Sequence, residues 1–509
     1  MPVMDSPPRA RVLLGHGLMV LLVCAAVYWP GLGRWGLHDT EGHRAIPAWE
    51  MMDSPGANPL VPRLFGRIYL RKPQGMTWAV AASSSIFGQS EFAARAVSAA
   101  SATLAALLAW VMAWRWFGWR SGIWGGLAQA LTPWFWPPGR SAEIESLNNV
   151  LTMAGVLLLI DALVVRPRRW RGVAIGVAAG VAFAGAGLAK GPASLPCLVA
   201  VVAAACVVGR SVGPIRSPAL WSALGVAGAA LGVIGVLTWR TMAGSGESAA
   251  LQSPGAFLWS SDRVLGIVTL APVACASALP MSLALLFVWW RGERREGGVE
   301  AGRMGMADLV ARTIAWTCVL SLALMTLAGV GNPRYAMPAF SFVSPLVAYV
   351  ARGWAGAFTI RRQALARALA LGSPVVWPVV VLLVAAGAYI MILEPRRGRT
   401  SGRDAGRALA AALPDGAIVW ADDLIEARPE TLWYAQREAL RDGRVIRFSW
   451  VEQGASLRLP EPGGYVILRD DAGSDESDAA RSQGLMDRLE AVERGSVHTY
   501  RFVVYRVVR

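Results

Sequence analysis

The stretch that decides the fold is a polar segment between two apolar runs. It begins LHDTEGHRA (37–45) and ends PRLFGRIYLRKPQG (62–75). Its ionisable side chains include Asp39, Glu41, His43, Arg71 and Lys72. Such groups are costly beside a bilayer and usually serve a function there. We therefore expect the other segments to form an apolar scaffold that places this loop over a cavity at a membrane surface.

The composition is that of a membrane protein. Of 509 residues, 55% are hydrophobic and 16% are charged, and apolar runs of about 20 residues recur along the chain. The net charge is +15, but the basic residues lie in short clusters between the apolar runs. This pattern is typical of membrane topology rather than of nucleic-acid binding. We predict a polytopic α-helical membrane protein with no nucleic-acid partner.

The apolar runs predict about eleven transmembrane helices. Their approximate cores are 12–30, 93–113, 121–136, 147–165, 172–189, 193–209, 217–238, 264–290, 313–330, 335–351 and 374–393. With a cytoplasmic N-terminus, the cytoplasmic segments hold 19 basic residues and the short outer loops hold five. Basic residues concentrate on the cytoplasmic side of membrane proteins. The asymmetry predicts a multi-pass protein of the cell (inner) membrane whose N-terminus is cytoplasmic.

The chain is predicted to divide into two domains. Residues 1–394 form the transmembrane domain, with a first extracytoplasmic loop over 32–92 that contains short interfacial helices at 41–52 and 74–87. Residues 395–509 lose the long apolar runs and read as a small soluble α/β domain outside the cytoplasm, large enough to bury its own core. Its predicted elements are helices at 403–413, 430–440 and 485–494 and strands at 417–420, 444–449, 464–469 and 498–507.

Lysine is nearly absent from this chain. Only Lys72 and Lys190 are lysines among the 49 basic residues. Chance survival is one explanation; the other is that both positions need a compact ammonium group rather than a planar guanidinium. The predicted topology places both lysines on the non-cytoplasmic side, together with other polar residues at the ends of spans: Asp39, Glu41, Arg71, Arg140, Glu143, Glu145, Arg334 and Tyr335.

Several motifs of this face resemble one family. DTEGHRA (39–45) and the segment 59–99 are similar to the patterns D-E-x-x-Y, Y-x-x-K-P-P and F-G-x-S-E-x-x-x-R of the bacterial relatives of the dolichyl-phosphate-mannose–protein mannosyltransferases. The group that contains the lipid A aminoarabinose transferases is the most similar. GRSAEIESLNNVL (139–151), GLAKGP (187–192) and GNPRYAMPAFSFVSPL (331–346) resemble three later motifs of that family, in the same order.

The matches and departures fall at identifiable positions. Residues that match the family patterns are Tyr69, Lys72, Pro73, Phe87, Gly88, Ser90, Glu91 and Arg95. Thr40 separates the acidic pair, Gln74 replaces the second proline, and Glu145 stands where aspartate is usual. The resemblance implies a glycosyltransferase of GT-C architecture that inverts the sugar's stereochemistry. It also implies a polyprenyl-phosphate sugar donor and leaves a lipid, a protein or a polysaccharide open as the acceptor.

The chemistry assigns roles to the residues of this face. An acceptor hydroxyl needs a carboxylate to take its proton, for which Asp39 is the candidate and Glu41 its partner or substitute. Asp39 is alternatively a helix cap, and Glu41 alternatively an exposed helix residue. Negative charge builds on the leaving phosphate, so cations must face it. The donor phosphate-binding candidates are Lys72, Lys190 and Arg334, each alternatively an interfacial residue.

Further contacts are predicted with less direct chemistry. The substrate-binding candidates are Tyr69, Arg71, Arg140, Glu145 and Tyr335. Arg71 is alternatively a contact for acidic membrane lipids, and Arg140 with Glu145 alternatively a structural ion pair. Asp39, Glu41 and His43 alternate in sequence, so they are weak candidates for a divalent metal. No cofactor is certain from the sequence, and a divalent metal is possible.

Two other classes of function compete with the transferase. A transporter or flippase for an anionic lipid-linked substrate predicts charges in the middle of spans and inverted repeats. The predicted spans are nearly free of ionisable residues. A membrane scaffold that presents residues 395–509 to a partner leaves the polar face without a purpose.

Overall fold

In the computed structural model, the described residues are 10–38, 40–54, 58–165, 169–245, 270–279, 281–296, 305–330, 332–358, 376–393, 402–450, 461–470, 485–497 and 500–508. Asp39 and the first part of the predicted helix 264–290 lie outside these ranges.

Helices overlap every range that was predicted to span the membrane. Their bounds are α1 (Ala10–Tyr28), α4 (Glu91–Phe117), α5 (Trp119–Leu131), α6 (Trp136–Arg140), α7 (Ile144–Ile160), α8 (Arg169–Lys190), α9 (Leu195–Gly209), α10 (Pro218–Ser245), α12 (Met281–Glu296), α13 (Met306–Leu327), α14 (Met337–Ser341), α15 (Pro345–Phe358) and α17 (Val376–Ala388). Among the described residues, five helical segments are long and apolar enough to cross a membrane, or six if a bent pair counts as one span. The chain is therefore an integral membrane protein, and the count of eleven spans stays a prediction.

The bundle is built around α4. Its first turn is capped by Ser90, whose hydroxyl accepts a hydrogen bond from the backbone N–H of Ala93 at 3.2 Å. Its neighbour α5 approaches closely through Gly126, where a Cβ atom would lie 2.9 Å from the Cβ of Trp110 and 3.1 Å from the carbonyl oxygen of Ala106. Small residues permit such close helix packing in membranes.

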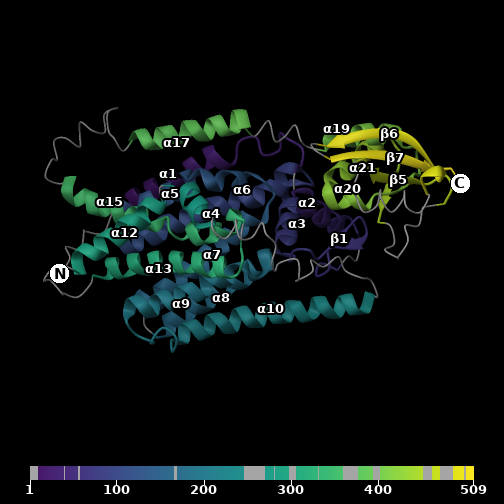
Figure 1. Ribbon diagram of the computed structural model, residues 1–509. Helices are drawn as coiled ribbons and strands as arrows, with labels where there is room; N and C mark the ends of the chain where they lie inside the picture. Colours follow the sequence, from purple (N-terminus) through teal and green to yellow (C-terminus); the bar gives the residue numbers. More distant parts are fainter. Residues whose placement is uncertain are drawn as a thin grey trace.

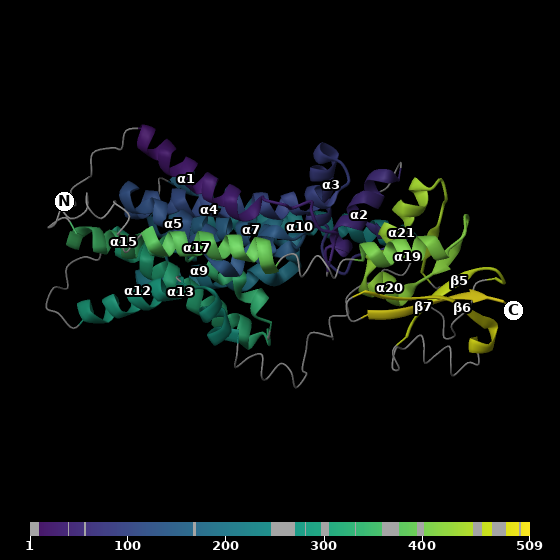
Figure 2. The same ribbon diagram turned by 90° about the horizontal axis from the view of Figure 1, so that it is seen from above.

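The first loop folds into its own elements. It contains α2 (Gly42–Asp53), a short antiparallel hairpin of β1 (Arg63–Leu64) and β2 (Arg67–Ile68), and α3 (Gly75–Phe87). The two short helices predicted in this loop are confirmed. Figures 1 and 2 both show α2 and α3 between the helix bundle and the C-terminal sheet, and Figure 1 shows β1 there as well.

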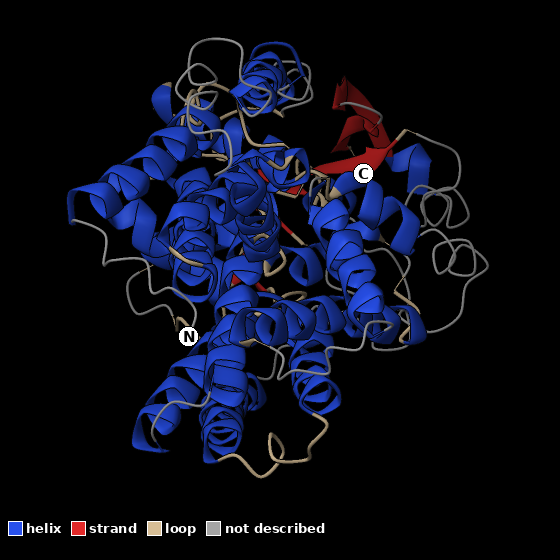
Figure 3. Cartoon of the chain, turned by 90° about the vertical axis from the view of Figure 1, so that its left-hand side faces the viewer, coloured by secondary structure: helices blue, strands red, loops and turns tan. Residues whose placement is uncertain are grey.

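The C-terminal residues form a five-stranded sheet with helices. The strand order is β4-β3-β5-β7-β6, in which β3 is parallel to β4 and β5, and β7 is antiparallel to β5 and β6. The elements are α19 (Arg403–Ala412), β3 (Ile418–Trp420), α20 (Asp422–Ala427), α21 (Pro429–Arg441), β4 (Arg447–Ser449), β5 (Tyr465–Arg469), β6 (Leu489–Val497) and β7 (Tyr500–Val507). Viewed along the bundle, the most visible strands lie to one side of the helices, near the C-terminus (Figure 3).

One predicted C-terminal element is wrong. The helix predicted over 485–494 is a 3₁₀ turn at Leu485–Arg488 followed by strand β6. The residues from Leu489 onward pair with β7 as an antiparallel ladder. Pairing with the next strand of the chain, which itself pairs with β5, outweighs the helix propensity of the local sequence. That propensity is a weak determinant by itself.

The C-terminal sheet and the first loop share one core. Trp49 of α2 packs on Trp433 of α21 with ring centroids 4.4 Å apart, and Phe65 meets Phe448 edge-on at 6.2 Å. Buried residues of both regions belong to a single apolar cluster. The C-terminal region therefore buries its apolar side chains partly against the loop, rather than only within itself as the sequence suggested.

Candidate active site at the membrane surface

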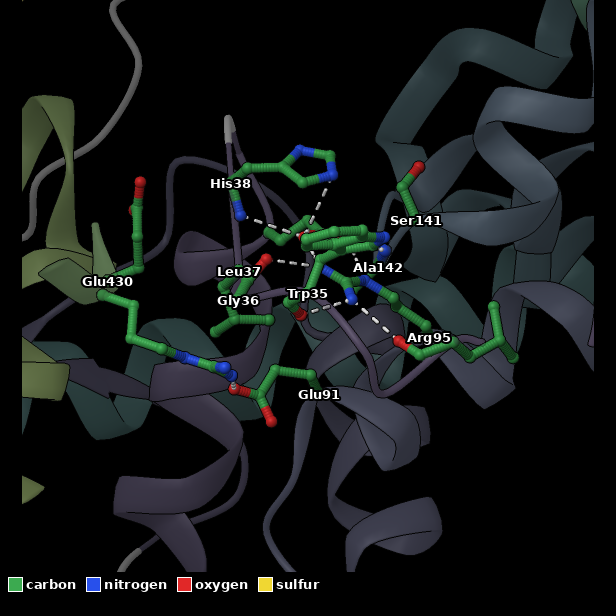
Figure 4. Close-up of polar contacts among 12 residues, drawn as sticks. Trp35, Gly36, Leu37, His38, Glu91, Arg95, Ser141, Ala142 and Glu430 are labelled. Carbon is green, nitrogen blue, oxygen red and sulfur yellow. Dashed lines mark hydrogen bonds and ion pairs between the residues drawn. The ribbon is translucent and has the colours of Figure 1, made fainter. Parts of the chain in front are cut away.

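Glu41, at the start of α2, is fully buried and surrounded by donors. Arg95 donates to both of its oxygens, from Nε to Oε1 at 2.8 Å and from Nη2 to Oε2 at 2.6 Å. The backbone N–H groups of His38 and Ala142 donate to the same carboxylate at 3.0 and 2.7 Å (Figure 4). Each oxygen thus accepts two hydrogen bonds, which satisfies the acceptor capacity that a buried carboxylate must fill.

The environment keeps Glu41 ionised. Burial acts to raise its pKa, but the charges of Arg95 and His38 and the hydrogen bonds from Arg95 and Ala142 lower the pKa to about 2. A carboxylate that is buried and saturated with donors is poorly placed to take a proton from a substrate. In place of the predicted catalytic role, the structure supports a positioning role, in which Glu41 holds the loop that carries Asp39.

Arg95 fixes the same loop from α4. Beyond Glu41, its guanidinium donates to three backbone carbonyl oxygens of the loop, those of Leu32 (2.7 Å), Trp35 (2.8 Å) and Gly36 (2.8 Å). Charge-assisted hydrogen bonds of this kind are among the stronger ones in proteins. The segment that leads to Asp39 is therefore anchored to a membrane helix.

Four of the predicted site residues come together at the ends of α7 and α8. The ammonium of Lys190 lies 3.2 Å from Oε1 of Glu145 and 4.2 Å from the ring centroid of Tyr335. Arg334, in the 3₁₀ turn Pro333–Ala336, pairs with Glu143 and lies 3.9 Å from Oε2 of Glu145. Residues far apart in sequence thus meet in one charged cluster.

Lys72 belongs to the same electrostatic environment. Burial lowers its pKa, and the charges of Arg44 and Lys190 lower it further, whereas Glu145 acts in the opposite direction. The two lysine segments touch through Gly75, where a Cβ atom would lie 2.6 Å from the carbonyl oxygen of Leu188. The glycine permits a backbone approach that no larger residue allows. The two lysines of the chain are therefore neighbours, which sequence separation alone does not reveal.

The sequence interpretation missed one cation, Arg44. Its side chain is buried, its Nη1 donates to the carbonyl oxygen of His43 at 3.3 Å, and it hydrogen-bonds Tyr69. Among the described residues, its Nε has no hydrogen-bond partner. A buried guanidinium with an unsatisfied donor is a candidate anion ligand. The only sequence signal was its place inside the acidic motif.

His43 is a poor metal ligand in this arrangement. Its Nε2 lies 2.9 Å from the carbonyl oxygen of Glu426, so this nitrogen carries the proton and donates. Burial, followed by the charge of Arg44, lowers its pKa to about 3. In the described part of the chain no group of three metal-binding side chains occurs. The metal at Asp39, Glu41 and His43 stays a prediction, and the saturated carboxylate of Glu41 disfavours it.

Two predicted substrate contacts have structural partners instead. Arg140 is 2% exposed and donates to the carbonyl oxygens of Val27 at 3.0 Å and Pro30 at 2.5 Å, at the end of α1. Arg71 forms an ion pair with Glu426 of α20, which joins the first loop to the C-terminal region. Glu145, which the sequence paired with Arg140 as one alternative, contacts Lys190 and Arg334.

Comparison with known proteins shows which family and which solved structures this chain resembles. The model of the dolichyl-phosphate-mannose-protein mannosyltransferase family matches residues 71–239, a range that contains Lys72, Glu145 and Lys190. The crystal structures of ArnT from Cupriavidus metallidurans, apo and bound to undecaprenyl phosphate, have TM-scores of 0.64 and 0.65 at 17% identity. They align with 97% and 98% of this chain and with 98% of each ArnT chain. This chain has the ArnT fold.

The chain also resembles a solved oligosaccharyltransferase structure, less closely than it resembles ArnT. The Archaeoglobus fulgidus oligosaccharyltransferase tethered to an acceptor peptide has a TM-score of 0.50 at 13% identity, covering 99% of this chain and 75% of its own. No curated protein matches the sequence of this chain. The family resemblance predicted from the motifs is confirmed.

Proposed function

We propose that this protein is a membrane glycosyltransferase that moves a sugar from a polyprenyl-phosphate donor to an acceptor on the non-cytoplasmic face. The mannosyltransferase family model and the ArnT fold support this reaction class. One of the ArnT structures is bound to undecaprenyl phosphate, a ligand of the class proposed here as donor carrier. The acceptor, whether lipid, protein or polysaccharide, is left open.

The observation that carries the proposal is the cation cluster. Lys190 and Arg334 both lie beside Glu145, and Lys190 also lies over the ring of Tyr335. Lys72 is close enough that the charge of Lys190 lowers its pKa. Sugar transfer releases a lipid phosphate, whose growing negative charge is stabilised by fixed cations in a site poor in water. We assign Lys72, Lys190 and Arg334 to the donor phosphate, with Arg44 as a fourth cation and Tyr335 beside the sugar.

The acidic end of the first loop receives the acceptor in this proposal. Asp39 takes the proton of the attacking hydroxyl as general base. Glu41 and Arg95 hold the backbone that leads to it. The N–H of His38 donates a hydrogen bond to Glu41, and Arg95 donates one to the carbonyl oxygen of Gly36. The proposed topology has eleven spans and a cytoplasmic N-terminus, with the C-terminal region on the same side as the site.

The test is turnover by the purified chain in detergent, where transport across a membrane is impossible. The donors are undecaprenyl-phosphate glucose and undecaprenyl-phosphate mannose, each offered with a lipid, a protein or a polysaccharide that supplies the acceptor hydroxyl. The measured product is free undecaprenyl phosphate. Asp39→Asn should lower turnover about 100-fold or more, the usual contribution of a general base. Lys72→Met should weaken binding of undecaprenyl phosphate about 10-fold or more, as expected for a lost charged hydrogen bond.

The matched control is Arg447→Met at an exposed position of β4, which removes one positive charge outside the cation cluster. It should leave turnover and lipid binding unchanged. Asp39→Asn should still bind undecaprenyl phosphate, which separates chemistry from binding. Normal transfer by both Asp39→Asn and Lys72→Met would refute the assignment of the site. Movement of the lipid across vesicles without any turnover would favour the transporter.

A further inference from the structure

A polar cavity outside the cation cluster lies where α19 and α21 meet the start of α4. Its volume is about 280 Å³. Its charged lining consists of Arg403, Arg407, Arg437, Arg441, Glu91 and Glu438. None of these residues belongs to the proposed donor site, so the cavity needs a separate explanation.

The cavity has an excess of positive charge. Glu91 is occupied by Arg403 at 2.5 Å and by the hydroxyl of Tyr434 at 2.9 Å. Glu438 is occupied by Arg441 at 3.1 Å. Each lining carboxylate thus already has an arginine partner, and two guanidinium groups of the lining remain to be balanced.

The two remaining arginines have only weak or neutral partners among the described residues. Arg407 lies 3.5 Å from Asp404, but that carboxylate is 95% exposed, and such surface pairs contribute little. Arg437 packs over the ring of Trp433 at 4.6 Å and donates to the carbonyl oxygen of Gln89 at 3.5 Å. Guanidinium groups in such a setting suit a phosphate, which they can bind through two parallel hydrogen bonds.

The position of the cavity points to the membrane as the source of that phosphate. Ser90 and Glu91, at the first turn of α4, contribute to its lining, and α4 is one of the helices able to cross a membrane. Just before it, α3 ends in Ile86 and Phe87, whose exposed fractions are 74% and 54%. Phe87 packs edge-on against Phe92 at 5.4 Å. Exposed apolar and aromatic side chains at a helix end are typical of the membrane–water interface.

We propose that this cavity binds the phosphate headgroup of an anionic membrane phospholipid, with Arg407 and Arg437 as its principal ligands. The acyl chains of the lipid then lie against the exposed apolar end of α3. Because the cavity is formed by both α4 and the C-terminal helices, the bound headgroup fastens the C-terminal region to the bundle. Basic surface clusters beside a membrane helix recognise anionic lipids in this way.

The proposed lipid site is connected to the first loop. The hydroxyl of Tyr434 donates to Glu91 and accepts the backbone N–H of Leu37 at 2.6 Å. Glu91 and Arg95 are four residues apart and thus on one face of α4. Figure 4 shows Glu91, Arg95 and Leu37 in this region of the loop. Occupation of the cavity would therefore steady the backbone that leads to Asp39.

The experiment measures lipid retention by the full-length protein in nanodiscs of phosphatidylcholine with a minority of phosphatidylglycerol. Native mass spectrometry after release counts the bound phosphatidylglycerol. The variant Arg407→Gln/Arg437→Gln should retain it about 10-fold less well than the wild type, as expected when two charge-assisted contacts are lost. The matched control Arg447→Gln/Arg494→Gln removes two exposed arginines from the sheet and should retain it normally.

A single variant guards against misfolding. The side chain of Arg407 is 55% exposed, so Arg407→Gln removes charge with little loss of packing, and it should also weaken retention. Equal retention by the wild type and the variants would overturn the proposal. A second arm titrates inorganic phosphate and follows the melting temperature. Stabilisation by phosphate, without any preference for phosphatidylglycerol over phosphatidylcholine, would assign the cavity to a small soluble anion and would also overturn it.

Discussion

The guanidinium of Arg95 and the carboxylate of Glu41 form a two-pronged ion pair in the interior, with contacts of 2.8 and 2.6 Å. The two residues come from a membrane helix and from the polar loop, and both side chains are nearly inaccessible to solvent. The pair therefore attaches the loop to the bundle at a defined point. Removing one partner leaves the other charge buried without compensation.

Glu41→Gln should strongly destabilise the protein. The substitution keeps the shape of the side chain but leaves the buried charge of Arg95 unpaired, which typically costs about 3–5 kcal/mol. The measurement is the midpoint of unfolding in detergent. Glu490→Gln, at an exposed position of β6, is the control and should leave the midpoint unchanged. An unaltered midpoint in Glu41→Gln would contradict the structural importance of the pair.

The pH dependence of stability should contain a contribution from His43. Its pKa falls from 6.5 to about 3 on folding, so the unfolded chain binds the proton more tightly. Its contribution to stability is complete above pH 6.5 and is lost as the pH falls toward 3. Between pH 7.5 and 5 the loss is roughly 2 kcal/mol, at about 1.4 kcal/mol per proton and pH unit.

His43→Gln tests this contribution because glutamine retains an N–H donor but does not titrate. The difference in stability between the variant and the wild type should change over pH 7.5 to 5. The comparison must be a difference, since Glu50 has a pKa raised to about 7, chiefly by burial, and acts in the opposite direction over this range. Glu41 does not interfere, because its contribution is lost only as the pH falls from 4.5 toward 2. Parallel curves for the two proteins would exclude the buried neutral histidine.

Tyr434→Phe should slow the proposed reaction without impairing donor binding. Burial, followed by the charge of Glu91, raises the pKa of Tyr434 well above its usual value, so its hydroxyl stays protonated and donates to Glu91. The variant also removes the acceptor of the Leu37 N–H, and leaving such a buried group unpaired costs about 1–3 kcal/mol.

The expected signature is a lower kcat with little change in KM for the lipid-linked donor, since the cation cluster is untouched. Hydrogen exchange at the amide of Leu37 should become faster. Tyr505→Phe on β7 is the control and should change neither quantity. A rise in KM at constant kcat would place Tyr434 in donor binding instead.

Gly42→Ala should loosen the contact between the first loop and the C-terminal helices. A Cβ atom at this position would lie 2.9 Å from Oε2 of Glu430 and 3.1 Å from Cγ of Pro429. Such overpacking costs about 1–3 kcal/mol. Gly225→Ala is the matched control, since no atom lies within 4 Å of a Cβ there, and it should stabilise α10 by up to about 1 kcal/mol.

Limited proteolysis and melting temperature report the result together. Gly42→Ala should melt lower than the wild type and be cut more readily between the bundle and the C-terminal region. Gly225→Ala should melt at the same temperature or higher. Equal behaviour of the two glycine variants would mean that the contact at Glu430 adapts without cost.

The sequence alone identified the apolar runs and the family motifs, and it predicted the short helices of the first loop. A run of about 20 apolar residues has few alternatives to a buried or membrane helix, so its position is decided locally. The lysine count singled out Lys72 and Lys190 for the same reason: composition is a property of the chain alone. Most of the C-terminal strands also followed from their local pattern.

Only the tertiary structure decided the partners of the polar residues. It buried Glu41 against Arg95, turned Arg140 toward the carbonyl oxygens at the end of α1, and brought Arg44 beside Tyr69. It also made β6 a strand and merged the C-terminal core with the first loop. Local sequence determines where helices form because their hydrogen bonds close within one segment. Whether a side chain stays ionised, and with which partner, depends on which distant residue buries or neutralises it. That is known only once the chain is folded.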